Sequence, residues 1–245
     1  MPSVTIEVCV DNIASFDNAV SAGADRIELC SALPLGGLTP TYGLSLLASR
    51  SPISTYAMIR PRGGYFVYSA NEVDLMCDEI QCFRDLGFSG IVVGALTTNA
   101  QIDIKATSKF VSCAGDMGVT FHRAFDLVVD PFSALESLID LGCERVLTSG
   151  CESTATAGIE CIRQLVEQSQ QRISIMPGCG VNKANAKTII DSTGAREIHL
   201  SAKRAHPSPM RSEHIKAAMG SNANDDHLVG ISDAEMIAEI VRQLR

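Results

Sequence analysis

Two short segments of the chain carry a carboxylate and a thiol at the same spacing. The sequence reads IEVC at residues 6–9 and IELC at residues 27–30. In an extended strand, side chains two residues apart point to the same face, so Glu7 shares a face with Cys9 and Glu28 shares one with Cys30. A buried face that carries charge and sulfur is costly unless these groups have partners. The repeated pattern therefore indicates a functional site.

The two thiols are suited to holding one metal ion. Adjacent strands lie about 4.8 Å apart, so Cys9 and Cys30 would be close together if their strands are neighbours. Two thiolates with few other ligands favour a soft monovalent ion, above all copper(I). Zinc would require about four ligands, and the sequence shows no such cluster. The same proximity would also permit a redox disulfide.

Basic residues and glycines after other predicted strands are typical of an anion site. Arginine and backbone N–H groups at turns bind carboxylates and phosphates. The candidate anion-binding residues are Arg60, Arg62, Gly178, Gly180, Lys203 and Arg204. The helix after the two glycines is expected to begin near Asn182.

A third group of residues offers acid–base chemistry. Histidine and carboxylate side chains are the usual proton donors and acceptors in enzymes. The candidates are Glu28, His122, Asp126 and His199, and other polar residues expected at the same site are Glu7, Arg123, Ser149 and Ser201. The alternative interpretation is structural: the charged groups would form a buried ion-pair network, and the histidines would be core residues.

The elements that must position these residues alternate between strand and helix. Strands are predicted at 4–10, 26–30, 55–60, 90–95, 119–123, 145–149, 173–176 and 197–200. Helices are predicted near 13–22, 40–50, 71–86, 103–115, 132–141, 155–168, 183–192 and 232–244, the last with a capping box of Ser232 and Glu235. Eight such pairs predict a single-domain (β/α)₈ TIM barrel over residues 1–245. A doubly wound open sheet is the alternative, although it usually has fewer strands and a glycine-rich first turn.

The barrel prediction explains why the polar residues belong together. In this fold the active site lies at the C-terminal ends of the strands, and the loops after strands seven and eight commonly bind phosphate. The residues singled out above fall at these ends. About thirty residues, 202–231, separate the eighth strand from the last helix, and we expect them to form a long loop over the barrel mouth.

Composition excludes several classes of protein. The chain has 245 residues, 46% of them hydrophobic, and a formal net charge of −8. The acidic balance argues against nucleic-acid binding, which needs a basic surface. No apolar run is long enough for a membrane span, and the N-terminus lacks a signal-peptide pattern. Nine cysteines without a CxxC pair predict free thiols in the cytoplasm.

Several longer motifs resemble the CutC family, which is named for copper homeostasis. They are GADRIELC at 23–30, GGLTP at 36–40, IRPRGG at 59–64, VTFHRAFD at 119–126 and RVLTSG at 145–150, and the similarity extends to SPMR at 208–211. The resemblance implies a cytosolic barrel that self-associates as a dimer or tetramer and takes part in copper handling. It also implies copper(I) binding by two thiols, at positions that match Cys9 and Cys30.

Three hypotheses for the function follow. The first is a cytosolic copper(I)-binding barrel that buffers or transfers the ion through Cys9 and Cys30. The second is an enzyme acting on a small anionic or phosphorylated substrate, which Arg60, Arg62 and the loops after strands seven and eight would hold. The third is a scaffold whose function lies in its self-association.

Overall fold

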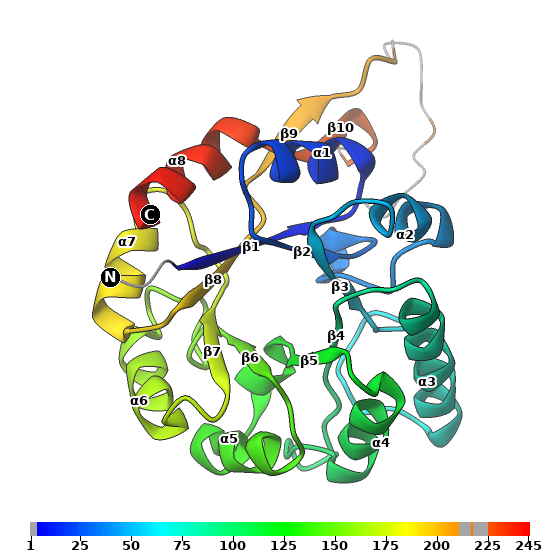
Figure 1. Ribbon diagram of the computed structural model, residues 1–245, viewed down its shortest axis with the longest axis vertical. Coiled ribbons are helices and arrows are strands. Elements are labelled where there is room, and N and C mark those ends of the chain that lie inside the picture. Colours follow the sequence, from blue (N-terminus) through cyan, green and yellow to red (C-terminus); the bar gives the residue numbers. More distant parts are fainter. Residues whose placement is uncertain (1–3, 211–216, 218–224) are drawn as a thin grey trace.

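In the residues that the structure describes, 4–210, 217 and 225–245, eight parallel strands stand in a ring surrounded by helices (Figure 1). This computed structural model has the barrel strands β1 (Thr5–Val10), β2 (Arg26–Leu29), β3 (Ser54–Met58), β4 (Gly90–Val93), β5 (Gly118–Phe121), β6 (Arg145–Thr148), β7 (Ser174–Pro177) and β8 (Glu197–Leu200). The helices are α1 (Ile13–Ser21), α2 (Tyr42–Ala48), α3 (Ala70–Asp85), α4 (Ile104–Ala114), α5 (Pro131–Asp140), α6 (Ile159–Ser169), α7 (Ala186–Thr193) and α8 (Ala234–Leu244). Short 3₁₀ turns lie at Leu33–Leu35, Arg123–Leu127 and Asp225–His227.

The strand order confirms the predicted TIM barrel. Neighbouring strands follow the order β7-β6-β5-β4-β3-β2-β1-β8, and β7 and β8 contact each other where the ring closes. The strands that carry the two IExC segments, β1 and β2, are direct neighbours, with Cys9 opposite Glu28. The doubly wound alternative is therefore wrong, because β7 and β8, the two ends of this order, contact each other and close the ring.

Alternation along the strands separates an apolar outer core from a polar interior. Outward side chains pack under the helices, among them Ile6, Val8, Ile27, Leu29, Ile91, Val93, Phe121, Val146, Ile175 and Ile198. Inward positions carry buried polar groups, namely Glu7, Arg26, Glu28, Thr120, His122, Arg145 and His199. The outer core supplies the hydrophobic stabilisation, so the interior of the barrel is free to present chemistry.

Two glycines make space for an aromatic ring low in the barrel. A Cβ at Gly90 would lie 2.1 Å from Tyr56 Cε1, and one at Gly118 would lie 2.2 Å from Tyr56 Oη. No side chain fits at those distances. The glycines of β4 and β5 therefore place Tyr56 across the interior.

The connection after β8 is partly regular, which corrects the expectation of a loop throughout 202–231. Strands β9 (Lys203–Pro207) and β10 (Leu228–Ser232) pair as an antiparallel ribbon beside α1 (Figure 1). The ribbon does contribute to the mouth, because Lys203 and residues 228–230 line the cavity there. The ribbon thus joins the site to the last helix.

Several predicted helix starts are wrong by two to four residues, among them that of α6, which begins at Ile159 instead of near 155. Asp233 rather than Ser232 caps α8, and its side chain accepts from the backbone N–H of Met236. Helix α7 begins at Ala186 instead of near Asn182, because residues 183–185 form turns. Among the helices of the described residues, none is both long and apolar enough to cross a bilayer.

Candidate functional site

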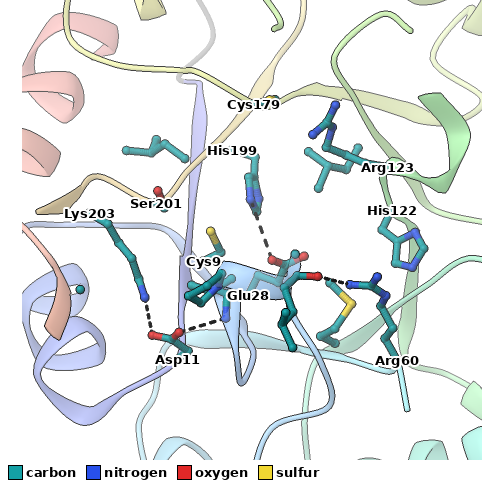
Figure 2. A pocket seen from close by; sticks show the side chains of 18 of the residues that line it. Cys9, Asp11, Glu28, Arg60, His122, Arg123, Cys179, His199, Ser201 and Lys203 are labelled. Atoms are coloured by element: carbon teal, nitrogen blue, oxygen red, sulfur yellow. Dashed lines mark hydrogen bonds and ion pairs between the residues drawn. The ribbon is translucent and has the colours of Figure 1, made fainter. Parts of the chain in front are cut away.

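A cavity of about 970 Å³ opens at the C-terminal ends of the barrel strands (Figure 2). Its walls come from β1, β2, β3, β6 and β8, the connection after β2, the 3₁₀ turn after β5, the loop after β7 and the β9–β10 ribbon. The predicted site residues among its lining are Cys9, Glu28, Arg60, His122, Arg123, Asp126, Gly180, His199, Ser201 and Lys203. The volume suits a small organic ligand and far exceeds the space that one metal ion needs.

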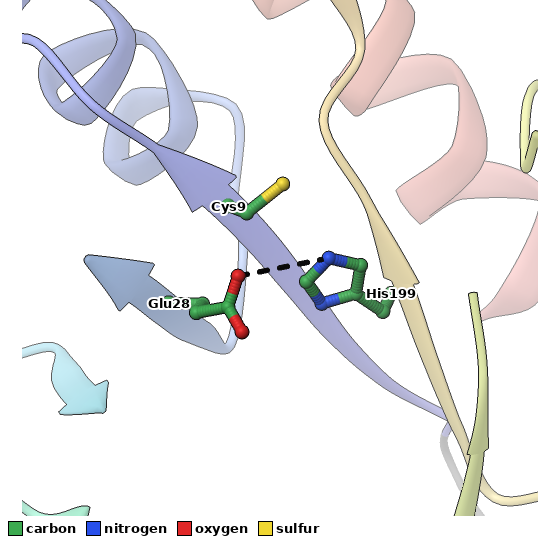
Figure 3. Close-up of side chains that lie close together, drawn as sticks. All are labelled: Cys9, Glu28 and His199. Carbon is green, nitrogen blue, oxygen red and sulfur yellow. Dashed lines mark ion pairs between the residues drawn. The ribbon is translucent and has the colours of Figure 1, made fainter. Parts of the chain in front are cut away.

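Three potential metal ligands from three strands meet on one side of this cavity. The ligand atoms of Cys9, Glu28 and His199 all lie within 4.8 Å of one another, and all three residues are buried (Figure 3). Glu28 Oε2 lies 3.9 Å from His199 Nε2. The register explains the meeting, because Cys9 faces Glu28 across β1 and β2 and His199 lies on β8, the other neighbour of β1.

His199 is held by a carboxylate beneath it. Its Nδ1 lies 2.7 Å from Glu7 Oε1, while Glu7 Oε2 accepts from Arg26 Nε at 2.5 Å. Although burial opposes it, the Arg26 guanidinium and the hydrogen bond from His199 lower the pKa of Glu7 to about 2. An ionised Glu7 that accepts from Nδ1 leaves Nε2 facing Cys9 and Glu28. Carboxylates orient metal-binding histidines in the same way.

Charge around the imidazole also changes its protonation. Burial disfavours the imidazolium, but the neighbouring Cys9 and Glu28 together with Glu7 raise the pKa of His199 well above its usual range. A proton on His199 is therefore stabilised as long as the site holds no cation. A cation that binds here competes with that proton.

One oxygen of Glu28 has no partner. Its Oε2 accepts from the thiol of Cys30 at 3.4 Å, whereas Oε1 is buried without a hydrogen bond. Burial raises the pKa of Glu28. Buried polar atoms are normally satisfied, so this oxygen is available to a ligand in the cavity.

Cys30 lies in a different environment from Cys9. Cys30 is fully buried among Tyr56, Met58 and Val92, and it does not belong to the cluster of three ligands. Burial raises the pKa of the Cys30 thiol well above its usual value. The two thiols are on neighbouring strands as predicted, but in this arrangement Cys30 contacts Glu28 rather than the cavity.

Arg60 and His122 lie on the opposite side of the cavity, with Phe66 between them. The guanidinium of Arg60 donates to the carbonyls of Leu35, Gly37 and Gly64 at 2.8 to 3.0 Å, and its carbon lies 5.0 Å from the centre of the Phe66 ring. The His122 ring centre lies 4.7 Å from that of Phe66. Arg60 Nε and His122 Nε2 are both buried without a partner.

The protonation of His122 is clear from its contacts. Nδ1 accepts from the backbone N–H of Ala124 at 3.1 Å, so the proton of the neutral ring is on Nε2. Burial and the charge of Arg60 lower the pKa of His122 to about 3. His122 is therefore a neutral hydrogen-bond donor at physiological pH.

Asp126 anchors the loop after β6 and is occupied in doing so. Its carboxylate accepts from the Thr148 hydroxyl at 2.5 Å, from the N–H and hydroxyl of Ser149, and from Cys151 N. Arg123 completes the group with contacts to Asp126 at 2.7 Å and Ser149 at 3.0 Å. The predicted residues Arg123, Asp126 and Ser149 thus form one unit at the rim.

The other predicted anion ligands are dispersed. Arg62 is exposed, pairs with Glu72 at 2.5 Å and does not line the cavity. Arg204 pairs with Asp233 at 3.1 Å outside the cavity, whereas Lys203 lines it and pairs with Asp11 at 2.5 Å. Gly180 lines the cavity, but a Cβ at Gly178 would lie 2.5 Å from Leu147 Cδ1, so that glycine serves close packing.

Among the lining residues that the sequence did not single out, three bear on the chemistry: Asp11, Met58 and Phe66. Asp11 directly follows β1 and continues the i, i+2 spacing of Glu7 and Cys9, which could have identified it. Met58 lies two residues before Arg60, so the same i, i+2 spacing could have identified it. Phe66 lies in the connection between β3 and α3, where no periodic pattern points to the cavity.

A second polar layer fills the barrel below the mouth. Arg145 pairs with Glu197 at 2.5 Å and with Glu144 at 2.9 Å, and Arg26 pairs with the same Glu197 oxygen at 2.5 Å. Both guanidinium carbons lie 5.2 Å from the centre of the Tyr56 ring, whose hydroxyl donates to Glu144 at 2.7 Å. Every charge of this layer has an opposite charge beside it.

The architecture and the cavity define a TIM barrel with a polar mouth, and comparison with known proteins defines the family. The sequence profile of the CutC family matches residues 4–204. The chain is 48% identical over 236 residues to a family protein CutC of Pasteurella multocida, covering 96% of each chain. It is 46% identical over 242 residues to one of Vibrio cholerae, covering 98% of this chain and 95% of that one. The chain therefore belongs to the CutC family.

A solved structure agrees with this assignment. The crystal structure of a CutC protein from Streptococcus agalactiae, described as a candidate for copper homeostasis, is 34% identical with a TM-score of 0.77. The match covers 80% of this chain and 97% of that one. A phosphoribosylanthranilate isomerase from Thermotoga maritima has a TM-score of 0.58 at 12% identity, covering 98% of each chain, which shows a shared fold alone.

Proposed function

We propose that this protein takes part in copper homeostasis and binds copper(I) at the barrel mouth, with the thiolate of Cys9 as a ligand. The observation that carries the proposal is the buried cluster of Cys9, Glu28 and His199. A thiolate and an imidazole are ligands that copper ions accept, and the thiolate selects for copper(I). The membership of the CutC family supports the choice of metal.

The second copper ligand could be His199 or Cys30, and the geometry favours His199. Its Nε2 already faces Cys9 and Glu28, and Glu7 holds the ring from behind. In the two-thiol version Cys30 would have to leave Glu28 Oε2 and lose a proton from a thiol whose pKa burial raises well above its usual value. Glu28 is proposed as a neighbouring charge, because a carboxylate matches copper(I) poorly.

A competition titration tests the site. Reduced protein is titrated with copper(I) against a chelator, comparing wild type with Cys9→Ser, His199→Gln and Cys30→Ser. Cys143→Ser is the matched control, because Cys143 is a buried thiol in the outer core. We expect loss of tight binding in Cys9→Ser and at least tenfold weaker binding in His199→Gln, with the control unchanged.

The same titration separates the two versions. A larger loss in Cys30→Ser than in His199→Gln would establish the two-thiol site instead. Equal binding by Cys9→Ser and wild type would refute the mouth as the copper site. X-ray absorption of the loaded protein would report one sulfur and one nitrogen ligand in the favoured version and two sulfurs in the other.

The proposal includes a cytoplasmic location and a homo-oligomeric state. All nine cysteines are free thiols, which is consistent with a reducing compartment. Light scattering of the purified protein distinguishes a monomer from the expected dimer or tetramer. A monomer at micromolar concentration would contradict this part of the proposal.

A second candidate function is an enzyme acting on a small anionic substrate. The cavity of about 970 Å³ favours it, since copper binding uses only one corner of that volume. The Cys9→Ser variant separates the two functions. If it still converts a small anionic metabolite, the enzymatic function does not depend on copper binding.

A further inference from the structure

The cavity contains a buried positive charge, Arg60, that has no acidic partner among the residues described. Arg60 is 6% exposed, and its neighbours are backbone carbonyls, the Phe66 ring and the Tyr68 hydroxyl. The other cations near the cavity are paired: Arg123 with Asp126, Lys203 with Asp11, and Arg26 with two glutamates. Within the described part of the chain, no carboxylate forms an ion pair with Arg60. A buried charge without a counter-charge is costly.

A second unsatisfied donor is on the same wall. His122 is neutral and carries its proton on Nε2, which is buried and has no acceptor. Arg60 Nε, also a donor, is in the same condition. Each side chain lies against the Phe66 ring, and all three residues line the cavity. Native structures seldom leave such donors unpaired unless a ligand or an ordered water completes them.

We propose that the wall of Arg60, Phe66 and His122 binds the carboxylate of a small organic acid. The carboxylate compensates the charge of Arg60 and accepts from His122 Nε2–H, and hydrogen bonds to a charged group are the stronger ones. The site deepens the second candidate function by naming its ligand class. It is independent of the copper site, which uses other side chains across the cavity.

The surroundings favour a monoanionic carboxylate over a phosphate. Asp11 and Asp126 line the cavity but are paired with Lys203 and Arg123. Arg60 therefore offers one uncompensated positive charge, which a monoanion matches better than a dianion. Apolar side chains at Leu33, Leu127 and Leu147 provide contacts for the hydrocarbon part of an organic acid. Inorganic phosphate would make no use of them.

Phe66 is the part of the wall that must move. Both free N–H groups are enclosed, and the Phe66 ring lies against both side chains. Phe66 is only half-buried and belongs to the irregular connection between β3 and α3, where its carbonyl accepts from Leu96 N at 2.8 Å. We expect the ring to turn aside when the carboxylate binds, while this backbone bond is kept.

The test is binding of defined acids to reduced, copper-free protein of full length. Lactate, benzoate and inorganic phosphate are the probes, measured by NMR, with wild type compared with Arg60→Lys and His122→Phe. Arg62→Lys is the matched control, because Arg62 is a neighbouring arginine outside the cavity. We expect at least one of the carboxylates to bind and to shift the His122 Nε2–H signal. Its affinity should fall at least tenfold in Arg60→Lys, several-fold in His122→Phe, and not in the control.

The other outcomes overturn the proposal. It fails if neither carboxylate binds, if Arg60→Lys binds as well as wild type, or if phosphate binds more tightly than both acids. Cys9→Ser serves as a crossed variant: it should keep the carboxylate and lose copper(I), whereas Arg60→Lys should do the reverse. Failure of the carboxylate site and failure of the copper site are therefore distinguishable. If His122→Phe does not fold, the affinity of Arg60→Lys and the shift of the His122 Nε2–H signal in wild type still test the carboxylate site.

Discussion

The lower and upper polar layers of the barrel interior differ in how completely their charges are paired. In the lower layer, Arg26 and Arg145 share Glu197 and enclose Tyr56. In the upper layer, Glu28, Arg60 and His122 each retain one buried polar atom without a partner. Strands β2 and β8 contribute to both layers, with Arg26 below Glu28 on β2 and Glu197 below His199 on β8. The layers therefore differ in how completely their charged groups are paired.

This difference indicates which end of the barrel acts on a ligand. A complete ion-pair network adds little stability over apolar packing but is strongly destabilised when one member is removed. A buried polar group without a partner instead lowers the stability of the free protein, and a ligand that pairs with it restores that stability. Glu7 connects the layers, since one oxygen binds Arg26 below and the other binds His199 above. The ion pair of Glu7 with Arg26 in the lower layer thus fixes the imidazole of His199 in the upper layer.

The largest effect is expected when the same substitution is made in each layer. Glu7→Gln leaves Arg26 and His199 facing an uncharged group, and we expect a loss of about 3 to 5 kcal/mol in the free energy of unfolding. Glu28→Gln removes a carboxylate that has an unpartnered oxygen, and its effect should be within about 1 kcal/mol or stabilising. Urea denaturation of both variants measures the difference. Equal losses would show that the layers are energetically alike.

Gly90, which begins β4, and Gly94, which directly follows it, allow a second comparison between the layers. A Cβ at Gly94 would lie 2.3 Å from His122 Cε1, whereas one at Gly90 would lie 2.1 Å from Tyr56 Cε1. His122 faces the cavity and has space to shift, so Gly94→Ala should cost about 1 to 3 kcal/mol. Tyr56 is held between two guanidinium groups, so Gly90→Ala should cost more. Thermal unfolding of both variants measures the two losses of stability. A larger loss in Gly94→Ala than in Gly90→Ala would refute the idea that the lower layer is the more rigid one.

The pH dependence of stability should be different for the two layers. The pKa of His122 is about 3 in the folded protein, below its ordinary 6.5, so the unfolded chain binds the extra proton between these values. Stability from this group is present above pH 6.5 and is lost as the pH falls, by about 2 kcal/mol at pH 5. Glu7, with a pKa of about 2 against 4.5, loses its contribution only below pH 4.5.

His122→Phe isolates the upper-layer contribution. The variant should show a smaller loss of stability between pH 6.5 and 5 than wild type, while both should fall together below pH 4.5. Denaturant unfolding at half-unit pH steps gives the two curves. Parallel curves from pH 7 to 5 would mean that His122 is protonated in the folded state.

The strands were predictable from sequence because their outward positions alternate with polar inward ones. Predicted and observed strand ends differ by at most two residues. Helix starts were less predictable, since caps such as Asp233 depend on one side-chain contact. The ribbon of β9 and β10 was missed because its strands are mostly exposed and have no apolar alternation.

The members of the site were predictable, but their partners were not. Spacing on strands placed Glu28, Arg60, His122 and His199 at the mouth, as the structure has them. Spacing cannot show that Cys30 turns toward Met58, or that Arg62 leaves the cavity for Glu72, because both outcomes depend on side-chain packing. Phe66 was out of reach for the same reason.

The smallest effect is expected at the arginine that the sequence placed beside Arg60. Arg62 pairs with Glu72 and donates to three loop carbonyls, all at exposed positions, where such bonds contribute little. Arg62→Gln should therefore change stability only slightly, and salt should reduce even this difference. Arg60 also donates to three loop carbonyls but is buried, so Arg60→Gln leaves buried acceptors unpaired and should cost several times more. Urea denaturation at low and high salt compares the pair. If Arg62→Gln proved as costly as Arg60→Gln, the contrast between enclosed and exposed charges at this mouth would be wrong.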